Sequence, residues 1–307
     1  MSANSMQSQL QNTKNTHDYQ HTFSNILEKV QPLYDQFVPD SVKNRRNIEQ
    51  QIQPDCVIIS AIIWACMLGF SDQINQYKAI RLFLFPDRFP ERSRYSRICA
   101  NLKDVIKMIR CGYIQELHQN CPFSVIDSMP VPLCATIRNR QAQLFTGTAD
   151  IGFNATKQLF YYGLKLSVSI NHKGFPTGYV VSAASIHDIH VAPELVNQAP
   201  TPQVLSDKGY VSKELKYYFS DRGIDFWTPR KRNSTQPKVV NEHLLKRLRK
   251  RIETVFSSFS ILLGKIKNRS LAGFESKLEI VLLTYSFMLE RAQKFEANSL
   301  RYSLGQF

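Results

Sequence analysis

The first part of the chain has a helical pattern of apolar positions. Apolar residues recur at i, i+3, i+4 and i+7 from residue 23 onward, at Phe23, Ile26, Leu27 and Val30, as they do in an amphipathic helix. Residues 57–68 are apolar almost all round, which predicts a buried helix. Ser93 is placed to cap another helix that continues to about residue 109. We therefore predict an all-helical domain over 23–120, after a polar, disordered tail at 1–22.

From residue 121 the pattern changes to strands that alternate with helices. A short strand at 124–126 is followed by a turn at Pro130 and Pro132. Two alternating apolar segments, 160–170 and 179–181, flank a turn at 171–174, which predicts a hairpin. The remaining elements are expected in this order: helix 187–197, strand 203–206, helix 212–223, strand 224–228 and helix 241–263.

This order of elements predicts a mixed five-stranded sheet with flanking helices. No glycine-rich phosphate-binding turn and no P-loop lysine motif occurs in the sequence, which argues against a doubly wound nucleotide-binding fold. We expect an α/β domain over residues 121–295, preceded by the all-helical domain and followed by a tail at 296–307.

The composition excludes several classes of protein. Of the 307 residues, 43% are hydrophobic and 21% are charged, which rules out collagen-like and wholly disordered chains. The longest apolar run, 57–70, is shorter than the ~20 residues that span a bilayer, and no secretory signal opens the chain. The six cysteines form no C-x-x-C pair, so a zinc ribbon is disfavoured and reduced thiols in the cytoplasm are expected.

Basic residues outnumber acidic ones, and they are concentrated in one segment. The formal net charge is +14, and the 22 residues 230–251 hold nine basic side chains and one acidic side chain. Net charge by itself is compatible with nucleic acid, with an acidic membrane surface or with no specific partner. Two interpretations, a DNA contact or a solvated charge, are open for Arg92, Arg94, Arg97, Arg138 and Arg140.

Three acidic residues stand in informative places. Asp127 follows the first predicted strand and Asp207 follows the fourth, whereas Glu253 lies in the last helix beside a basic stripe. A buried carboxylate at a strand end is costly unless something pairs with it, and strand ends in such sheets face one crevice. Carboxylates on rigid elements suit Mg²⁺. Alternatively, Glu253 only neutralises Arg249 in a surface pair.

Two other kinds of site are compatible with the sequence. His187 and His190 have a spacing that can bind zinc, although no H-E-x-x-H motif is present. Asp188, which lies between them, is the alternative second acid. Tyr210 could be the nucleophile of a tyrosine recombinase, but the arginine and histidine residues that this class needs near its tyrosine are not found, so a structural aromatic is favoured.

Several long motifs follow one another in the second part of the chain. They are IDSMPVPLC with the following Arg138 and Arg140, then FYYGLKLSVSINHKGFPTGYVVSAASIHD, VLSDKGYVSKEL, RKRIETVFSSF and NRSLAGFESKLEIVLLTY. In this order they resemble the insertion-sequence 982 family of bacterial DDE transposases, over about residues 121–285. Sister families have a lysine or arginine six or seven positions after the glutamate, where this chain has Ser260 and Ile261, so that role is left unassigned.

The resemblance implies a fold, a site and a reaction. The domain at 121–295 would be an RNase H-like core in which Asp127, Asp207 and Glu253 are catalytic and bind two Mg²⁺ or Mn²⁺ ions. The reaction would be cleavage at the ends of the insertion sequence and transfer of the freed 3′-hydroxyl into target DNA. DNA contacts are expected at Arg138, Arg140, Arg230, Lys231, Arg232, Lys246, Arg249 and Lys250.

The resemblance also implies where and with what the protein works. Its partners would be the terminal inverted repeats of the element and the target DNA, with a homodimer or larger complex on DNA and no membrane. The place would be the bacterial cytoplasm, in association with the nucleoid. Two alternatives are kept: an inactive DNA-binding protein derived from a transposase, and a metal-dependent nuclease without strand transfer.

Overall fold

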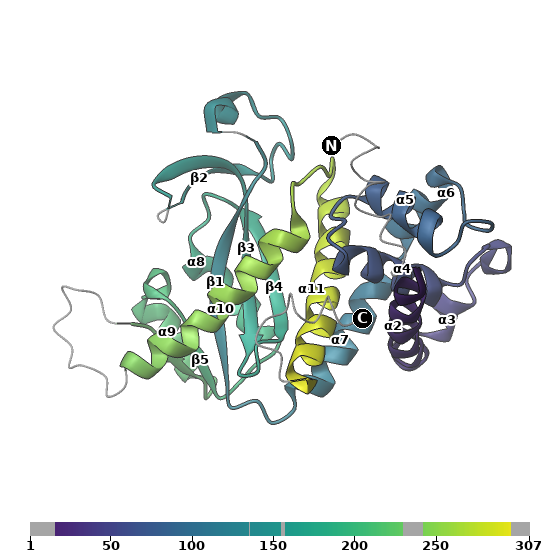
Figure 1. Cartoon of the computed structure of the whole chain (residues 1–307). Helices are drawn as coiled ribbons and strands as arrows, with labels where there is room; N and C mark the ends of the chain where they lie inside the picture. Colours follow the sequence, from purple (N-terminus) through teal and green to yellow (C-terminus); the bar gives the residue numbers. More distant parts are fainter. Residues whose placement is uncertain (1–15, 135, 155–156, 230–241, 296–307) are drawn as a thin grey trace. The chain divides into compact units, whose positions relative to one another are not determined.

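The computed structural model describes residues 16–134, 136–154, 157–229 and 242–295 (Figure 1). The chain divides into two compact units. Unit 1 comprises Met1–Gly112, Leu262–Lys265 and Glu275–Phe307, and unit 2 comprises Tyr113–Ile261 and Ile266–Phe274. The four-part division predicted from the sequence pattern stays a prediction. None of the described helices combines the length and the apolar character that a bilayer crossing requires.

The described part of unit 1 consists of helices. They are α2 (Thr16–Phe37), α3 (Asp40–Lys43), the 3-10 turn η1 (Ile48–Gln50), α4 (Asp55–Met67), α5 (Gln73–Phe83), α6 (Arg92–Asn101), and the larger parts of α7 (Lys103–His118) and α11 (Leu271–Lys294). The predicted buried helix is confirmed, because every residue of α4 except Val57 is buried.

Helix α2 begins earlier than the predicted tail allows. The tail was expected to reach residue 22, but the helix starts at Thr16. The first turns are anchored by Tyr19, whose ring packs against Trp64 and Phe83 at centroid distances of 5.7 and 5.3 Å. This long-range aromatic contact has no signature in the polar local sequence.

The predicted helix from Ser93 to residue 109 is two helices. The N-cap of α6 is Glu91 and not Ser93, so the helix begins two residues earlier than predicted, and Leu102 separates it from α7 with ψ near −2°. The amide of Leu102 still donates to Ile98 O at 2.9 Å, so the apolar stripe stays in register across the step. Periodicity alone therefore could not locate the break.

Unit 2 contains a six-stranded mixed sheet. Its strands are β1 (Phe123–Pro132), β2 (Asp150–Asn154), β3 (Leu159–Asn171), β4 (Pro176–Ala183), β5 (Gln203–Leu205) and β6 (Asp225–Trp227). The order is β2-β3-β1-β5-β6, with β4 also on β3. The pairs β1–β3, β2–β3 and β3–β4 are antiparallel, whereas β1–β5 and β5–β6 are parallel. A mixed sheet with helices is confirmed.

The prediction of five strands is wrong, because β2 was missed. This strand carries only two alternating apolar residues, Ile151 and Phe153, and both are exposed. It also contains Gly152, which is unfavourable in strands. The glycine is needed here, since a Cβ at this position would lie 2.5 Å from Ala184 O. Tertiary contact therefore decides the identity of this residue.

Strand β1 is longer than predicted and continues through Pro130 and Pro132, where a turn was expected. On β1, strand β5 pairs only with Phe123–Val125, whereas β3 pairs with β1 as far as Pro132. Beyond residue 125, one edge of β1 thus has no partner strand among the described residues. Proline is tolerated at such an edge, because its missing N–H removes no ladder hydrogen bond there.

Other local predictions are confirmed. Strands β3 and β4 form the expected hairpin, with Gly174 at φ 94° in its turn. The hydroxyl of Ser212 accepts the Leu215 amide and caps α9 (Lys213–Ser220). Gly223 has φ 70°, as a residue after a helix end commonly does.

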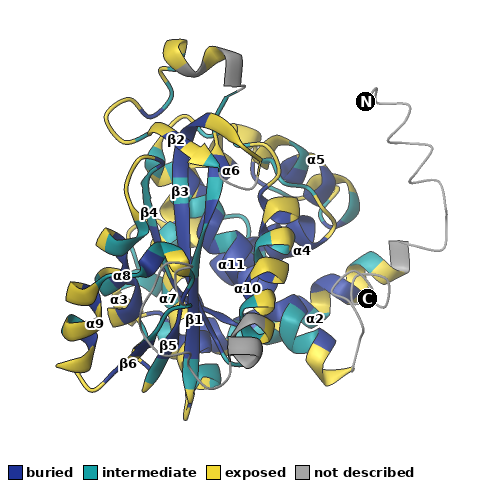
Figure 2. Ribbon diagram, turned by 90° about the vertical axis from the view of Figure 1, so that its left-hand side faces the viewer, coloured by how far each residue is buried: buried dark blue, intermediate teal, exposed yellow. Residues whose placement is uncertain are grey.

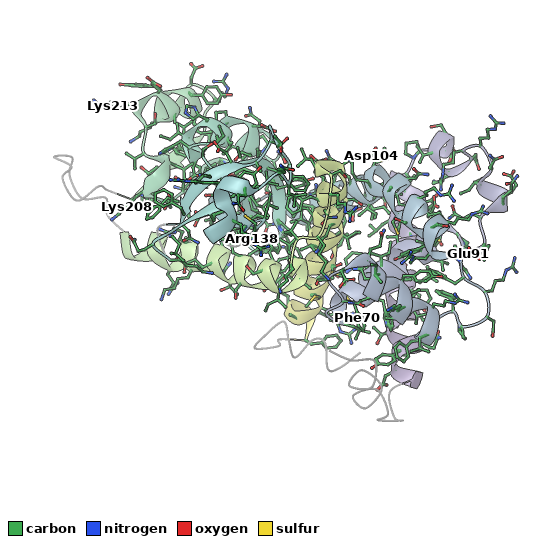
Figure 3. All side chains as sticks on the ribbon, turned by 90° about the horizontal axis from the view of Figure 1, so that it is seen from above. Phe70, Glu91, Asp104, Arg138, Lys208 and Lys213 are labelled. Atoms are coloured by element: carbon green, nitrogen blue, oxygen red, sulfur yellow. The ribbon has the colours of Figure 1, made fainter. Side chains whose placement is uncertain are left out.

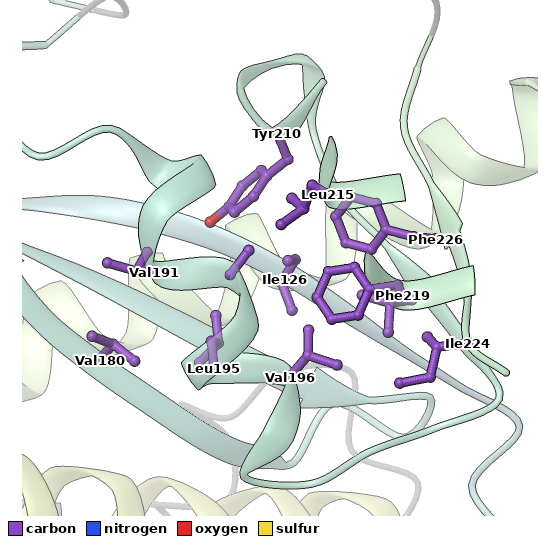
Figure 4. Close-up of a cluster of buried hydrophobic side chains, with 12 residues drawn as sticks. Ile126, Val180, Val191, Leu195, Val196, Tyr210, Leu215, Phe219, Ile224 and Phe226 are labelled. Carbon is purple, nitrogen blue, oxygen red and sulfur yellow. The ribbon is translucent and has the colours of Figure 1, made fainter. Parts of the chain in front are cut away.

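Helices cover the sheet of unit 2 on both faces (Figure 1). Ile126 of β1 packs in a buried cluster with residues of α8 (Asp188–Asn197) and α9 (Figure 4). Asp127, the next residue, contacts Arg249 of α10 (Glu242–Leu263), because successive strand residues point to opposite faces. Along α10, buried and exposed positions alternate as in an amphipathic helix (Figure 2).

Candidate active site

Two of the predicted acids occupy equivalent places beside the parallel ladder. The ladder of β1 and β5 ends at the pair Val125 and Leu205, and Asp127 and Asp207 each follow two residues later. The expectation that Asp127 ends its strand is wrong, since β1 continues to Pro132. What ends at this level is the pairing with β5. Residues two apart share a face, so the two carboxylates leave the ladder on the same side.

Asp127 is a largely buried carboxylic acid with an unusual pKa. Burial, and next the charge of Asp207, raise its pKa to about 7 from an ordinary value of 3.8. The amide of Ser128, which donates to Asp127 Oδ1 at 2.8 Å, and the guanidinium of Arg249 act in the opposite direction. These two interactions therefore do not offset the effects of burial and of Asp207 on the pKa of Asp127.

Asp207 is held by the turn that follows β5. It is the N-cap of the 3-10 turn η3 (Lys208–Tyr210), and its Oδ1 accepts the Gly209 amide at 2.5 Å. A Cβ at Gly209 would lie 2.9 Å from Asp207 Oδ1 and 3.3 Å from Asp188 Oδ2. The missing side chain of Gly209 thus leaves room where two carboxylates approach each other.

Asp188 is a third aspartate at this place. It is the first residue of α8, its Oδ1 accepts the hydroxyl of Ser128 at 3.0 Å, and it pairs with Lys165 Nζ at 3.1 Å. Lys165 also donates to Ile186 O at 2.7 Å. The sequence pattern offered Asp188 only as a substitute for Asp207, but the structure brings both together.

The two histidines beside Asp188 have other surroundings. Both His187 and His190 are exposed, and His187 Nδ1 accepts the Ile189 amide as the cap of α8. Within the described ranges, no group of three or more His, Cys, Asp or Glu residues is arranged to hold a metal. A zinc site at the histidines gains no support, and the predicted triad is likewise not gathered as a ready set of ligands.

Glu253 is connected to the aspartates through an arginine. It lies on α10 with 59% of its side chain exposed, and its Oε1 is 3.4 Å from Arg249 Nη2. The Nε of the same arginine is 3.8 Å from Asp127 Oδ2. The surface pair that was the alternative interpretation of Glu253 therefore exists. In addition, the guanidinium of Arg249 reaches Asp127 on β1.

Tyr210 lies within reach of the charges of the three aspartates. The side chain is fully buried, and its hydroxyl has no hydrogen-bond partner among the described residues (Figure 4). Burial, followed by the charges of Asp188, Asp127 and Asp207, raises the pKa of this phenol well above its usual value. A buried, firmly protonated phenol is a poor nucleophile, so the recombinase interpretation gains no support.

Three of these groups escaped the sequence interpretation: Ser128, Lys165 and the buried Tyr210 hydroxyl. One signal was available, because Lys165 is the only charged residue in the otherwise uncharged strand β3. A lysine at such a position needs a partner, and Asp188 is that partner. Nothing in the local sequence indicates that the charges of three aspartates, from separate parts of the chain, act on Tyr210.

The residues expected to bind DNA are only partly described. Arg138 and Arg140 are exposed on the 3-10 segment η2 (Thr136–Gln141; Figure 3), and Lys250 is exposed on α10. Arg249 is half-buried and faces the acids instead. Arg230, Lys231 and Arg232 lie outside the described residues, as does the side chain of Lys246.

Comparisons with known proteins point to one kind of domain. Residues 118–268 match the family model described as Transposase DDE domain; this segment is just under half of the chain and contains Asp127, Asp207 and Glu253. No curated protein sequence matches the chain. The solved "Cryo-EM structure of piggyBac transposase synaptic complex with hairpin DNA (SNHP)" aligns with a TM-score of 0.44 and 9% identity, over 94% of this chain and 78% of that chain; nothing below depends on this likeness. The family match supports a transposase DDE domain in residues 118–268.

Proposed function

We propose that this chain is a DNA transposase of the DDE type, which cuts and joins phosphodiester bonds at a site formed by Asp127, Asp207 and Glu253. The observation that carries the proposal is the pair of aspartates at equivalent positions beyond the β1–β5 ladder, within the segment that matches a transposase DDE domain. Glu253 is included because Arg249 connects its carboxylate to Asp127.

The aspartates fit a divalent cation, Mg²⁺ or Mn²⁺. The pKa of about 7 at Asp127 arises because burial and Asp207 act together against ionisation, and a bound cation relieves this kind of repulsion. Asp127 and Asp207 would hold it, and the number of ions stays a prediction. When bound, such a cation acts as a Lewis acid on the phosphate and strengthens the attacking oxygen.

The chain's own groups prepare this site. The Gly209 amide fixes Oδ1 of Asp207, and the Ser128 amide fixes Oδ1 of Asp127. Lys165 pairs with Asp188, so the negative charge that would repel a phosphate is reduced on that side. These hydrogen bonds hold one oxygen of each aspartate in place before substrate arrives.

The wider assignment rests on the resemblance and on charge. We propose that the fold of unit 2 is the RNase H-like core, that the chain belongs with the insertion-sequence 982 family, and that it acts as a homodimer or larger complex. Its substrates would be the terminal inverted repeats and target DNA. The exposed cations Arg138, Arg140 and Lys250 support phosphate binding.

The test is Mg²⁺- or Mn²⁺-dependent cleavage and joining of DNA that carries the element's own end. Wild type is expected to release a 3′-hydroxyl and to join it to a second duplex. Asp207→Asn is expected to lower both rates by at least about 100-fold, because the lost carboxylate acts on the reacting phosphate. Asp221→Asn, at an exposed acid of the same unit, is the control and should react like wild type.

Each other outcome has a definite meaning. Equal rates for wild type and Asp207→Asn would contradict the assignment of the site. Cleavage without joining would indicate a nuclease, and DNA binding without cleavage would indicate an inactive derivative of a transposase.

A further inference from the structure

The guanidinium of Arg249 lies between the carboxylates of Asp127 and Glu253. Arg249 stands one helical turn before Glu253 on α10, and it contacts Glu253 through Nη2 and Asp127 through Nε. These are two of the three carboxylates of the proposed site, and they belong to elements far apart in the sequence. The positive charge of Arg249 therefore lies where a cation ligated by both acids would have to act.

The contacts of Arg249 with the acids are loose. At 3.8 Å, the approach of Nε to Asp127 Oδ2 is too long for a hydrogen bond. This Nε is buried and has no hydrogen-bond partner among the described residues. The contact between Nη2 of Arg249 and Oε1 of Glu253 is also long, at 3.4 Å. A guanidinium held in this way makes one long hydrogen bond to Glu253 and leaves its Nε unsatisfied, so little is lost when it leaves the acids.

We propose that Arg249 is the resting counter-ion of Asp127 and Glu253, and that a divalent cation binds these carboxylates only by displacing its guanidinium. The inference rests on the proposed function, since it concerns the same acids. It assigns to Arg249 a role other than a permanent DNA contact, namely that of a residue that positions Asp127 and Glu253 before a cation binds.

Like charges explain why the two states exclude each other. A guanidinium within 4 Å of a carboxylate repels a divalent cation on the same carboxylate. Its planar donors match phosphate oxygens as well as carboxylate oxygens, so a displaced Arg249 becomes available to a DNA phosphate. Binding of the metal and binding of a phosphate beside it would then favour each other, because each removes Arg249 from the acids.

The first test measures Mn²⁺ binding without DNA. Wild type, Arg249→Met and Arg247→Met are titrated with Mn²⁺, and free Mn²⁺ is followed by electron paramagnetic resonance. Removing the competing guanidinium is expected to tighten Mn²⁺ binding of Arg249→Met by at least about threefold, since half-exposed ion pairs of this kind are worth a factor of up to about five. Arg247 is exposed on the same helix, and Arg247→Met is the matched control for the loss of one positive charge.

The outcomes separate this inference from the proposed function. Tighter binding by Arg249→Met, with Arg247→Met within a factor of two of wild type, supports the displacement. Equal or weaker binding by Arg249→Met, when wild type binds Mn²⁺, overturns the displacement alone. Absence of binding in all three proteins overturns the metal site of the proposed function, and the inference with it. Circular dichroism of each variant shows whether it is folded.

A second measurement uses only the wild-type protein. Phenylglyoxal modifies accessible arginines, and mass spectrometry of peptides gives the extent of modification at Arg249 and Arg247 separately. Mn²⁺ is expected to increase modification at Arg249 at least about twofold, because the guanidinium leaves the acids, with no change at Arg247. An unchanged or decreased reactivity of Arg249 at saturating Mn²⁺ would overturn the proposal.

Discussion

At the scale of single residues, the chemistry of the site depends on charges that the fold places together. Asp127 is separated from Asp207 by 80 positions in the sequence, yet it carries a pKa of about 7 because burial and that second acid act on it. Burial of Asp127 is the larger cause, and the charge of Asp207 is the next. The cost of holding the two carboxylates close is a feature of the folded state, so it is measurable as stability.

The pKa of Asp127 predicts a pH-dependent effect of Asp127→Asn. A carboxyl whose pKa is raised by folding favours the folded state at low pH, and this contribution is lost as pH rises from 3.8 to about 7. Relative to wild type, Asp127→Asn is therefore expected to gain stability from pH 5 to pH 8, by up to ~3 kcal/mol. Urea unfolding in EDTA measures this difference. A gain that does not change with pH would contradict the pKa shift, and Asp221→Asn is the control.

Gly209 allows a second prediction at this scale. Gly209→Ala would place a Cβ 2.9 Å from Asp207 Oδ1 and 3.3 Å from Asp188 Oδ2, so at least one carboxylate must move. We expect Mn²⁺ binding to weaken by about tenfold, which corresponds to ~1.4 kcal/mol. Titration with Mn²⁺ checks this; unchanged affinity would mean that the carboxylates at Gly209 do not act on the cation.

At the scale of elements, helices α7 and α11 are joined within unit 1 by a buried ion pair. Arg110 Nε donates to Glu279 Oε2 at 2.5 Å, and the side chains are 3% and 1% exposed. Nearer the surface, Lys103 and Glu275 form a second pair between the same helices, at 3.0 Å. The two pairs offer a comparison in which burial is the main variable.

Breaking the buried pair is expected to cost more than breaking the exposed one. Glu279→Gln removes the negative charge that faces the buried Arg110 guanidinium, which lowers the free energy of unfolding by about 3–5 kcal/mol. Glu275→Gln is the matched control, and it should cost less than about 1 kcal/mol. Urea denaturation compares the two variants. Equal losses would show that the Arg110 charge reaches water in the folded protein.

Element boundaries also show where local sequence is insufficient. The hairpin β3–β4 and the caps of α9 depend on residues close in sequence, and they were predictable for that reason. Strand β1 was not, because its continuation through Pro130 depends on which neighbouring strand pairs at that level. Strand β2 was missed because its two apolar residues are exposed, so it lacks the sequence pattern of a strand with one buried face.

At the scale of the whole molecule, the net charge of +14 predicts DNA binding that weakens with salt. If six to ten phosphates are contacted, the affinity for duplex DNA is expected to fall by ~10³–10⁵ between 50 and 200 mM salt. Lys250→Met should reduce the slope of log affinity against log salt by about 0.9, because this exposed lysine would contact one phosphate. Lys216→Met, at an exposed lysine on α9, is the control. Fluorescence anisotropy measures both slopes, and equal slopes would place the DNA away from α10.

The classes of element, the mixed sheet with helices, the three candidate acids and the location of the positive charge were predictable from the sequence. These features depend on local periodicity, turn residues and residue type, which the sequence contains directly. Folding alone pairs Asp188 with Lys165 and Ser128, brings Tyr210 within reach of the charges of the aspartates, and sets Arg249 between Asp127 and Glu253. The reason is that burial and pairing of charges depend on strand register and helix packing, which bring together residues from distant parts of the chain.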